Sequence, residues 1–558
     1  MRVFVFMMAL CFATSILAQK QNFKDYHPNG KLRSEGTYLY GLEDGQWKYY
    51  SADGQLEEAT MYKRGKMHGP VFRYHKNGRI MVEGYFKNDV QDSIQKTFSV
   101  DSVLLEIGQY KMGSKIGAWT YFFPKGDTMM IERHEDSIIR TWKQCSAPGT
   151  CEIVNGRGIV MEYFESGKPK KKVTYDRGLR NGEVVSYYSS GFTREQCMYK
   201  DDKREGTFVE YFPNQKVKQK ANYTNGILDG KLEDYYTNGQ LNASGSYTMG
   251  KKIGLWIWYK ESGIIEMQGE FKDDVQHGDW VYNYANGKLQ SKGKFAEGQM
   301  DGLWEYYYIN GQLWKKGVYQ KGLKQGKWEY FFENGKPLMI GEFKDDKEEG
   351  EWKSWFENGA KKDIGSYKGG KMSGKWEGWY PNGVKNYEGT WLVKSTKNAY
   401  IDKWSKVYKM NPDSVQTSEI TENKVGEWSY YRDSGMIERQ ETYSTDGSLN
   451  GEVKMFNEAG KLEAEGSYKN GKNHGKWTYY YPFGGLLRKC EYSEGKLDGQ
   501  SVMYNERGKV IEDCNYKDNK PHGMYIRYDD KTGKVLLKQE YDNGRVVKVL
   551  EGKPVRKQ

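Results

Sequence analysis

The side chains best able to do chemistry are few and recur at fixed positions of a repeating pattern. Four of the seven histidines occupy one position of a repeating pattern, in segments that are not neighbours: His68, His277, His474 and His522. Paired aspartates recur at a nearby position: Asp201-Asp202, Asp273-Asp274 and Asp345-Asp346. Separated histidines cannot share one metal ion, and Asp pairs are common in turns. We therefore expect solvated turn residues and no metal site.

No catalytic constellation accompanies these residues. The chain contains no G-x-S-x-G, H-E-x-x-H, P-loop or C-x-x-C motif. The 86 basic and 75 acidic residues give a net charge of +11 and are evenly mixed, which argues against a nucleic-acid-binding domain. We expect neither enzyme activity nor a cofactor.

The N-terminus has the layout of a secretory signal peptide over residues 1–18. An arginine is followed by an apolar run from Val3 to Ala13, then by small residues up to Ala18. The alternative is a single membrane anchor, but the run is short for a span of ~20 residues. We expect export to the periplasm, the cell surface or the medium.

Export would permit a disulfide between Cys145 and Cys151, which flank the turn-like segment SAPGT. The remaining mature cysteines occupy the small-residue position of the repeat described below: Cys197, Cys490 and Cys514. Cys490 and Cys514 are one repeat apart, so about 9–10 Å should separate them. Since disulfides need Cα atoms within ~7 Å, we expect free, packed thiols.

The elements that must hold these side chains repeat every 24 residues. A glycine recurs from Gly158 to Gly374 in nine steps of 24 without a slip, and about 20 units are recognisable in all. We call this glycine position 0. Position 2 is usually Trp, positions 5 and 17 are aromatic, positions 8 and 9 are often Asn-Gly, and position 15 is small. With 66 Gly and 15% aromatic residues, the composition suits short strands and tight turns better than large cores or disorder.

Asn-Gly between two alternating aromatic runs indicates a β-hairpin. With a two-residue loop, position 2 would pair with position 15 and position 6 with position 11, so that each Trp ring covers a glycine. We therefore predict an all-β fold: an elongated single-sheet antiparallel β-meander solenoid of about 20 hairpin repeats.

The phase of the repeat divides the chain. After the signal peptide we expect N-terminal repeats (19–126), an irregular insertion (127–157) and ten regular repeats (158–390). An insertion forming a long hairpin (391–421), C-terminal repeats (422–545) and a polar tail (546–558) follow. Insertions of this kind either carry a binding loop or are tolerated at hairpin ends.

Position 5 offers the best candidate for partner recognition, because it should place rings at ~10 Å intervals on an otherwise polar face. The row in the regular repeats is Tyr163, Tyr187, Tyr211, Tyr235, Tyr259, Tyr307, Phe331, Trp355 and Trp379. The alternative is that these rings only pack on one another. Lysines at positions 10 and 21 should line both rims, where they either prevent edge pairing or attract anionic lipid or polysaccharide.

A segment such as GLWEYYYINGQLWKKGVYQKGLKQ (302–325) resembles MORN repeats, and more closely the 24-residue variant of bacterial YwqK-type antitoxin-like proteins. The resemblance covers most of residues 21–545. It implies extended β-meanders that contact other proteins or membranes. The antitoxin label implies a toxin partner, which an exported chain would not fit well.

We therefore expect an exported, non-enzymatic MORN-like scaffold for protein–protein interaction. Two alternatives stay open: an envelope-associated module that binds lipid or glycan through the aromatic row and lysine rims, and an antitoxin or immunity protein. The oligomeric state is not predicted.

Overall fold

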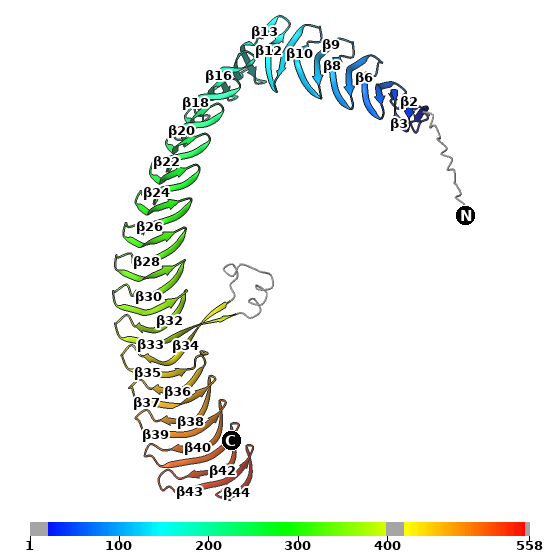
Figure 1. Cartoon of the computed structure of the whole chain (residues 1–558). Coiled ribbons are helices and arrows are strands. Elements are labelled where there is room, and N and C mark those ends of the chain that lie inside the picture. The colour runs from blue at the N-terminus through cyan, green and yellow to red at the C-terminus, as the bar shows by residue number, and fades with distance from the viewer. Residues whose placement is uncertain (1–19, 398–417, 553–558) are drawn as a thin grey trace, which may run out of the picture. The chain divides into compact units, whose positions relative to one another are not determined.

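The computed structural model describes residues 20–397 and 418–552. The predicted signal peptide (1–18) lies outside the described residues, as does the central part of the insertion. Every element described is a strand, and the 44 strands form one antiparallel sheet in which strands that follow one another in the chain pair, except that β4 pairs with β2 past the two-residue β3 (Figure 1). The predicted all-β, single-sheet meander is therefore confirmed.

The chain divides into two compact units, the first ending at Ile253 and the second beginning at Gly254, with Glu261–Gly263 counted in the first. The strands up to the boundary are β1 Lys20–Tyr26, β2 Leu32–Leu39, β3 Leu42–Glu43, β4 Gly45–Tyr50, β5 Leu56–Lys63, β6 Lys66–Tyr74, β7 Ile80–Lys87, β8 Val90–Phe98, β9 Leu104–Lys111, β10 Ser114–Phe122, β11 Thr128–Glu135, β12 Ile138–Ala147, β13 Thr150–Val154, β14 Arg157–Tyr163, β15 Pro169–Asp176, β16 Leu179–Tyr187, β17 Thr193–Lys200, β18 Lys203–Tyr211, β19 Val217–Thr224, β20 Ile227–Tyr235 and β21 Leu241–Thr248.

The strands that follow are β22 Lys251–Tyr259, β23 Ile265–Lys272, β24 Val275–Asn283, β25 Leu289–Ala296, β26 Gln299–Tyr307, β27 Leu313–Gln320, β28 Leu323–Phe331, β29 Pro337–Lys344, β30 Lys347–Trp355, β31 Lys361–Lys368, β32 Lys371–Trp379, β33 Lys385–Lys397, β34 Ser418–Tyr431, β35 Ile437–Tyr443, β36 Leu449–Phe456, β37 Leu462–Lys469, β38 Lys472–Tyr480, β39 Leu486–Ser493, β40 Lys496–Tyr504, β41 Val510–Lys517, β42 Lys520–Tyr528, β43 Val535–Asp542 and β44 Arg545–Glu551.

Segments outside the regular repeat also join the sheet. Residues 127–157 contribute β11, β12 and β13, and residues 545–551, most of them expected in a polar tail, form β44. In the insertion at 391–421, β33 and β34 pair as far as Lys397 and Ser418. The sheet register thus continues where the sequence motif is lost.

The Asn-Gly turn is one residue longer than predicted. The Tyr308 amide donates to the Gln312 carbonyl (2.8 Å) and the Gly311 amide to the Tyr308 carbonyl (2.9 Å). Gly311 has φ 96°, so the loop is a type I turn followed by a left-handed glycine. Position 5 therefore pairs with position 11, as Tyr307 does with Leu313, and the predicted pairing of positions 6 and 11 is wrong.

Asparagine is used at position 8 because it links successive turns. The Asn310 side chain accepts the Gln312 amide (2.8 Å) and donates to the Glu333 carbonyl of the next repeat (3.1 Å). Lysine at position 10 adds a second link, since the Lys336 ammonium donates to the Asn358 carbonyl at 3.0 Å. Lysines of this rim are therefore engaged in binding the next turn.

The repeat glycine marks a bulge between successive hairpins. Gly317 pairs with Trp328, whereas the following Val318 pairs with Gln325, which leaves Gly326 and Lys327 unmatched. Gly326 has φ 61°, a conformation that glycine adopts without strain. The bulge shifts the pairing between hairpins by two residues and so decides which side chains of neighbouring repeats meet.

Candidate functional site

One face of the sheet carries aromatic rings in close contact. We call it the aromatic face and define it by positions 2, 4, 13 and 17 of the repeats. In the second unit, Trp304 lies edge-on between Phe295 (5.3 Å between ring centroids) and Tyr319 (6.4 Å). Alternation of position 2 and position 17 rings continues this contact along the row. The position 2 Trp rings are deeply buried, with Trp304 only 2% exposed.

Each Trp ring covers a glycine of the preceding hairpin. The Trp304 ring occupies the space that a Cβ on Gly293 would need, and Trp328 does the same at Gly317. In its own hairpin Trp304 pairs with Gly317, as predicted. A Trp at position 2 therefore pairs with position 15 of its own hairpin and with position 15 of the preceding hairpin. Its ring lies over the glycine of the preceding hairpin.

Position 4 adds a second ring row that the sequence analysis did not identify. Trp304 stacks on Tyr306 with ring centroids 5.9 Å apart. The Tyr306 hydroxyl lies 3.4 Å from that of Tyr319. Burial, followed by the neighbouring Tyr319 hydroxyl, raises the pKa of Tyr306, so this phenol stays neutral. The available signal was the recurrence of tyrosine one position before the predicted row in three consecutive repeats, at Tyr282, Tyr306 and Tyr330.

Side chains at position 13 lie between these position 4 rings. Lys315 is paired with Tyr306 on one side and Tyr330 on the other. Ser291 occupies the same place between Tyr282 and Tyr306 but is too short to fill it. The result is a hollow of about 330 Å³, which we call the Ser291 hollow.

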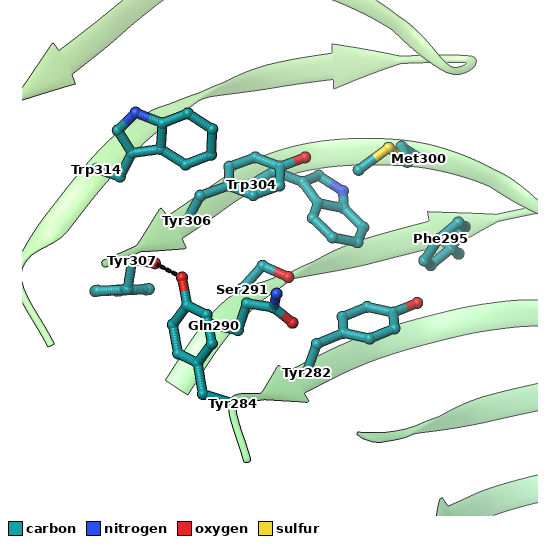
Figure 2. Close-up of a pocket in the computed structure, with 10 residues that line it drawn as sticks. All are labelled: Tyr282, Tyr284, Gln290, Ser291, Phe295, Met300, Trp304, Tyr306, Tyr307 and Trp314. Atoms are coloured by element: carbon teal, nitrogen blue, oxygen red, sulfur yellow. Dashed lines mark hydrogen bonds between the residues drawn. The ribbon is translucent and has the colours of Figure 1, made fainter. Parts of the chain in front are cut away.

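Figure 2 shows the rings around the Ser291 hollow. Its lining residues are Tyr282, Tyr284, Gln290, Ser291, Phe295, Met300, Trp304, Tyr306, Tyr307 and Trp314. Tyr284 is fixed by donating its hydroxyl hydrogen to the Tyr307 carbonyl at 2.6 Å. Trp314 is the most open ring, 38% exposed, and packs edge-on against Tyr306 at 6.4 Å. Such an apolar hollow with a few polar groups is typical of a binding site.

Lys315 places a positive charge beside this hollow. Its ammonium lies 4.4 Å from the ring centroids of both Tyr306 and Trp314. Burial and the nearby Lys324 lower the pKa of Lys315. Among the ion pairs of the described residues, none involves the Lys315 or the Lys324 ammonium. The positive charge at this edge of the hollow is therefore not neutralised by a carboxylate.

A second hollow, of about 240 Å³, is lined by Leu338, Met339, Trp352, Lys353, Ser354, Lys362, Asp363, Tyr367 and Trp376. Here position 4 is Ser354, where the three preceding repeats have tyrosine, and position 13 is the acidic Asp363 in place of Lys315. Asp363 accepts hydrogen bonds from the hydroxyls of Tyr387 (2.8 Å) and Ser354 (3.2 Å). We call it the Ser354 hollow.

The predicted row at position 5 lies on the opposite, polar face. Tyr307 donates to Glu305 at 3.0 Å, and Lys292 pairs with the same carboxylate at 2.9 Å; these contacts lower the pKa of Glu305, Lys292 having the larger effect. Tyr235 donates likewise to Glu233 at 2.8 Å.

Of the predicted position 5 row, which also includes Tyr259, eight rings make no ring–ring contact in the described part of the chain. They are Tyr163, Tyr187, Tyr211, Tyr235, Tyr307, Phe331, Trp355 and Trp379. Tyr163 is 59% exposed. The stacking expected at position 5 occurs instead at positions 2, 4 and 17.

The cysteines fall into two groups. Cys145 and Cys151 form a disulfide between β12 and β13. Cys197, Cys490 and Cys514 are buried and free, and burial raises the pKa of the Cys514 thiol to about 11. A thiol held in this neutral form is a poor nucleophile.

Within residues 20–397 and 418–552, no group of three His, Cys, Asp or Glu side chains could hold a metal ion. In the same ranges no helix has the length and apolarity needed to cross a bilayer. The Asp pairs lie in two-residue turns, with φ 51° at Asp345 and 64° at Asp346. Asp346 accepts the Lys324 amide at 2.8 Å.

Comparison with known families gives the repeat its name. The MORN repeat variant matches residues 22–40, 43–64, 67–88, 157–177, 204–225, 228–248, 252–273, 276–297, 300–321, 324–345, 348–368, 449–470, 473–494 and 497–518, which is more than half of the chain. The chain belongs to the MORN repeat variant family. The Ser291 hollow lies within the matched MORN repeats 276–297 and 300–321. No curated protein matches the chain.

Among solved structures, the chain is similar to the crystal structure of TcdB2-TccC3-Cdc42, with 10% identity, 96% of this chain and 32% of that chain covered, and a TM-score of 0.13. For the crystal structure of TcdB2-TccC3 the values are 10%, 95%, 35% and 0.12. A mutant Photorhabdus luminescens Tc holotoxin pore gives 10%, 96%, 32% and 0.13. The MORN chain spans about a third of the length of these chains, and TM-scores this low say nothing about its function.

Proposed function

We propose that this MORN-repeat chain is an exported, non-enzymatic scaffold that binds a protein partner through its aromatic face. The Ser291 hollow carries the proposal, because the row of rings opens there and the exposed ring of Trp314 lies at its edge. Tyrosine and tryptophan are the residues most enriched at the centres of protein interfaces. The polar face is less suitable, since its tyrosines are already bonded to carboxylates such as Glu305.

The proposal is tested by partner capture from envelope extract of the host organism, using the full chain as bait. Trp314→Ala removes the most open ring of the hollow, which is 38% exposed. Leu303→Ala is the matched control, because Leu303 is 52% exposed and belongs to the same hairpin. We expect a partner that is captured by the wild type and by Leu303→Ala but lost with Trp314→Ala. Equal capture by all three chains would refute binding through the aromatic face.

A further inference from the structure

We infer that the Ser291 hollow receives one flat or unbranched apolar side chain from an acidic segment of a partner protein, with a carboxylate of that segment pairing with Lys315. The inference rests on the proposed function, because it names the chemistry of the partner that the aromatic face would bind. Three features of the structure carry it: the shape of the hollow, its charge, and its isolation in the row.

The other repeats show what fills the equivalent space. Met267 lies between Trp258 and the next repeat's Tyr282, and Lys315 lies between Tyr306 and Tyr330. Both are long, unbranched side chains, whereas Ser291 ends one atom beyond its Cβ. Because rings at position 4 are two strands apart, their backbones are separated by ~10 Å. The one strand between Tyr282 and Tyr306 contributes a single side chain to this space, so the hollow has room for one flat or unbranched group in place of the side chain that Ser291 lacks.

The charge beside the hollow selects an anionic partner. The residues that line the hollow include no Asp or Glu. The Lys315 ammonium lies over two lining rings at 4.4 Å, and Lys324 follows on the same face, 4.9 Å from the Trp328 ring centroid. A basic ligand would add a third positive charge in a half-buried place, whereas a carboxylate would neutralise one that is present.

The isolation of the hollow favours a protein side chain over a polymer of sugars or a lipid. The equivalent space on one side is filled by Met267 and on the other by Lys315. Successive sugar rings would need successive open spaces along the row, and an acyl chain would need a longer channel than about 330 Å³ provides. One side chain projecting from a peptide needs a single space.

The inference is tested with the full chain and three blocked five-residue peptides: Trp flanked by Glu, Trp flanked by Lys, and Ala flanked by Glu. Affinity is measured by saturation-transfer NMR at low salt. We expect the Glu-flanked Trp peptide to bind about tenfold more tightly than either of the others. Ser291→Met, which supplies the side chain found at Met267, and Lys315→Met should each weaken this binding about fivefold or more.

Ser354→Met is the matched control, because it fills the Ser354 hollow and leaves the Ser291 hollow intact. Its affinity for the peptide should equal that of the wild type. Circular dichroism and amide hydrogen exchange of β25, β26 and β27 establish that each variant is folded. If Ser291→Met disturbs these strands, Ser291→Leu and the charge-only variant Lys315→Gln provide the same comparison.

Equal binding of the Lys-flanked peptide, or an unchanged affinity in the folded Ser291 variant, would overturn the inference. So would binding of anionic phospholipid vesicles or of a polyuronate oligosaccharide that depends on Ser291 when the peptide does not bind. A partner captured through Trp314 that the peptide fails to displace would leave the proposed function standing and remove this inference. Peptide binding at the Ser291 hollow without any Trp314-dependent partner would support the hollow's chemistry and count against the scaffold function.

Discussion

Gly317→Ala should destabilise the hairpins around it, although alanine is normally the more stabilising residue in extended backbone. The new Cβ would lie 2.5 Å from Cγ of Trp328 and closer still to Cδ2 and Cε2 of its ring. Trp328 is 0% exposed, so the ring has no free space to move into and must lift off the sheet.

The magnitude follows from two opposing terms. Reduced freedom of the unfolded chain favours alanine by about 0.4–1 kcal/mol. Forcing a packed side chain from its place typically costs about 1–3 kcal/mol, and loss of most contacts of a buried Trp about 3–5 kcal/mol. We therefore expect a net destabilisation of about 2–4 kcal/mol, confined to β27, β28 and their neighbours, because each repeat contacts only the next.

Gly84→Ala is the matched control at the same repeat position. A Cβ on Gly84 would meet only Gln91 and Gln95 side-chain atoms at 4.0 Å, because position 2 of the following repeat is Gln95. This substitution should be neutral or stabilise β7 by up to about 1 kcal/mol. The contrast isolates the ring, since backbone effects are shared by both glycines.

The measurement is native-state hydrogen exchange of the full chain, because a long repeat array does not unfold in one cooperative step. A second substitution, Trp328→Leu, in the Gly317→Ala chain recreates the natural pair Ala221 and Leu232. We expect a favourable coupling of about 1 kcal/mol or more between the two substitutions. Unchanged protection in Gly317→Ala, or strictly additive effects in the double variant, would refute the argument that Trp328 excludes a side chain at position 15.

Three further predictions follow from the same architecture. Burial raises the pKa of Tyr330 from 10.0 to about 12. The contribution of this neutral phenol to the free energy of unfolding is therefore complete below pH 10 and is lost as the pH rises towards 12. Absorbance titration at 295 nm should show a late-titrating phenol in the wild type that is missing in Tyr330→Phe. The Cys145–Cys151 disulfide closes a loop with a sequence separation of 6, which stabilises the fold by about 2 kcal/mol by chain entropy. Mild reduction should therefore increase hydrogen exchange in β12 and β13 alone. Increased exchange throughout the chain would contradict a local role. Deleting residues 326–349 removes one repeat and brings Gly317 under the next repeat's Trp, so the strand content should be retained. Deleting residues 326–337 removes half a repeat and should destroy the strand content around the deletion. Equal circular dichroism of both deletions would contradict the repeat register.

The position 15 residues show how far the sequence could be interpreted. The small-residue pattern was visible, and it predicted a glycine opposite a Trp. However, the pairing that decides residue size is the one with the next repeat. Gly317 faces Trp328, whereas Cys197 faces Phe208 and Ala221 faces Leu232 across the same kind of strand pair. A glycine at position 15 precedes each position 2 Trp, and position 15 is larger in most repeats that no such Trp follows, Gly84 beside Gln95 being an exception. This complementarity is hidden until the bulge at position 0 is known.

The sequence alone determined the 24-residue unit, the antiparallel hairpins and the presence of aromatic rows, because alternation along a strand and turn residues are local properties. Only the tertiary structure decided which faces of neighbouring hairpins meet. The two-residue shift at Gly326 sets that register, and the extra loop residue at Gly311 changes the pairing near the turn. The position 5 row lies on the polar face, as alternation along the strand predicted, whereas the Ser291 hollow opens between position 4 rings that this register brings together. A cavity depends on the combined sizes of residues 24 positions apart, which lie two strands apart, and of the residue on the strand between them. No local pattern specifies that combination.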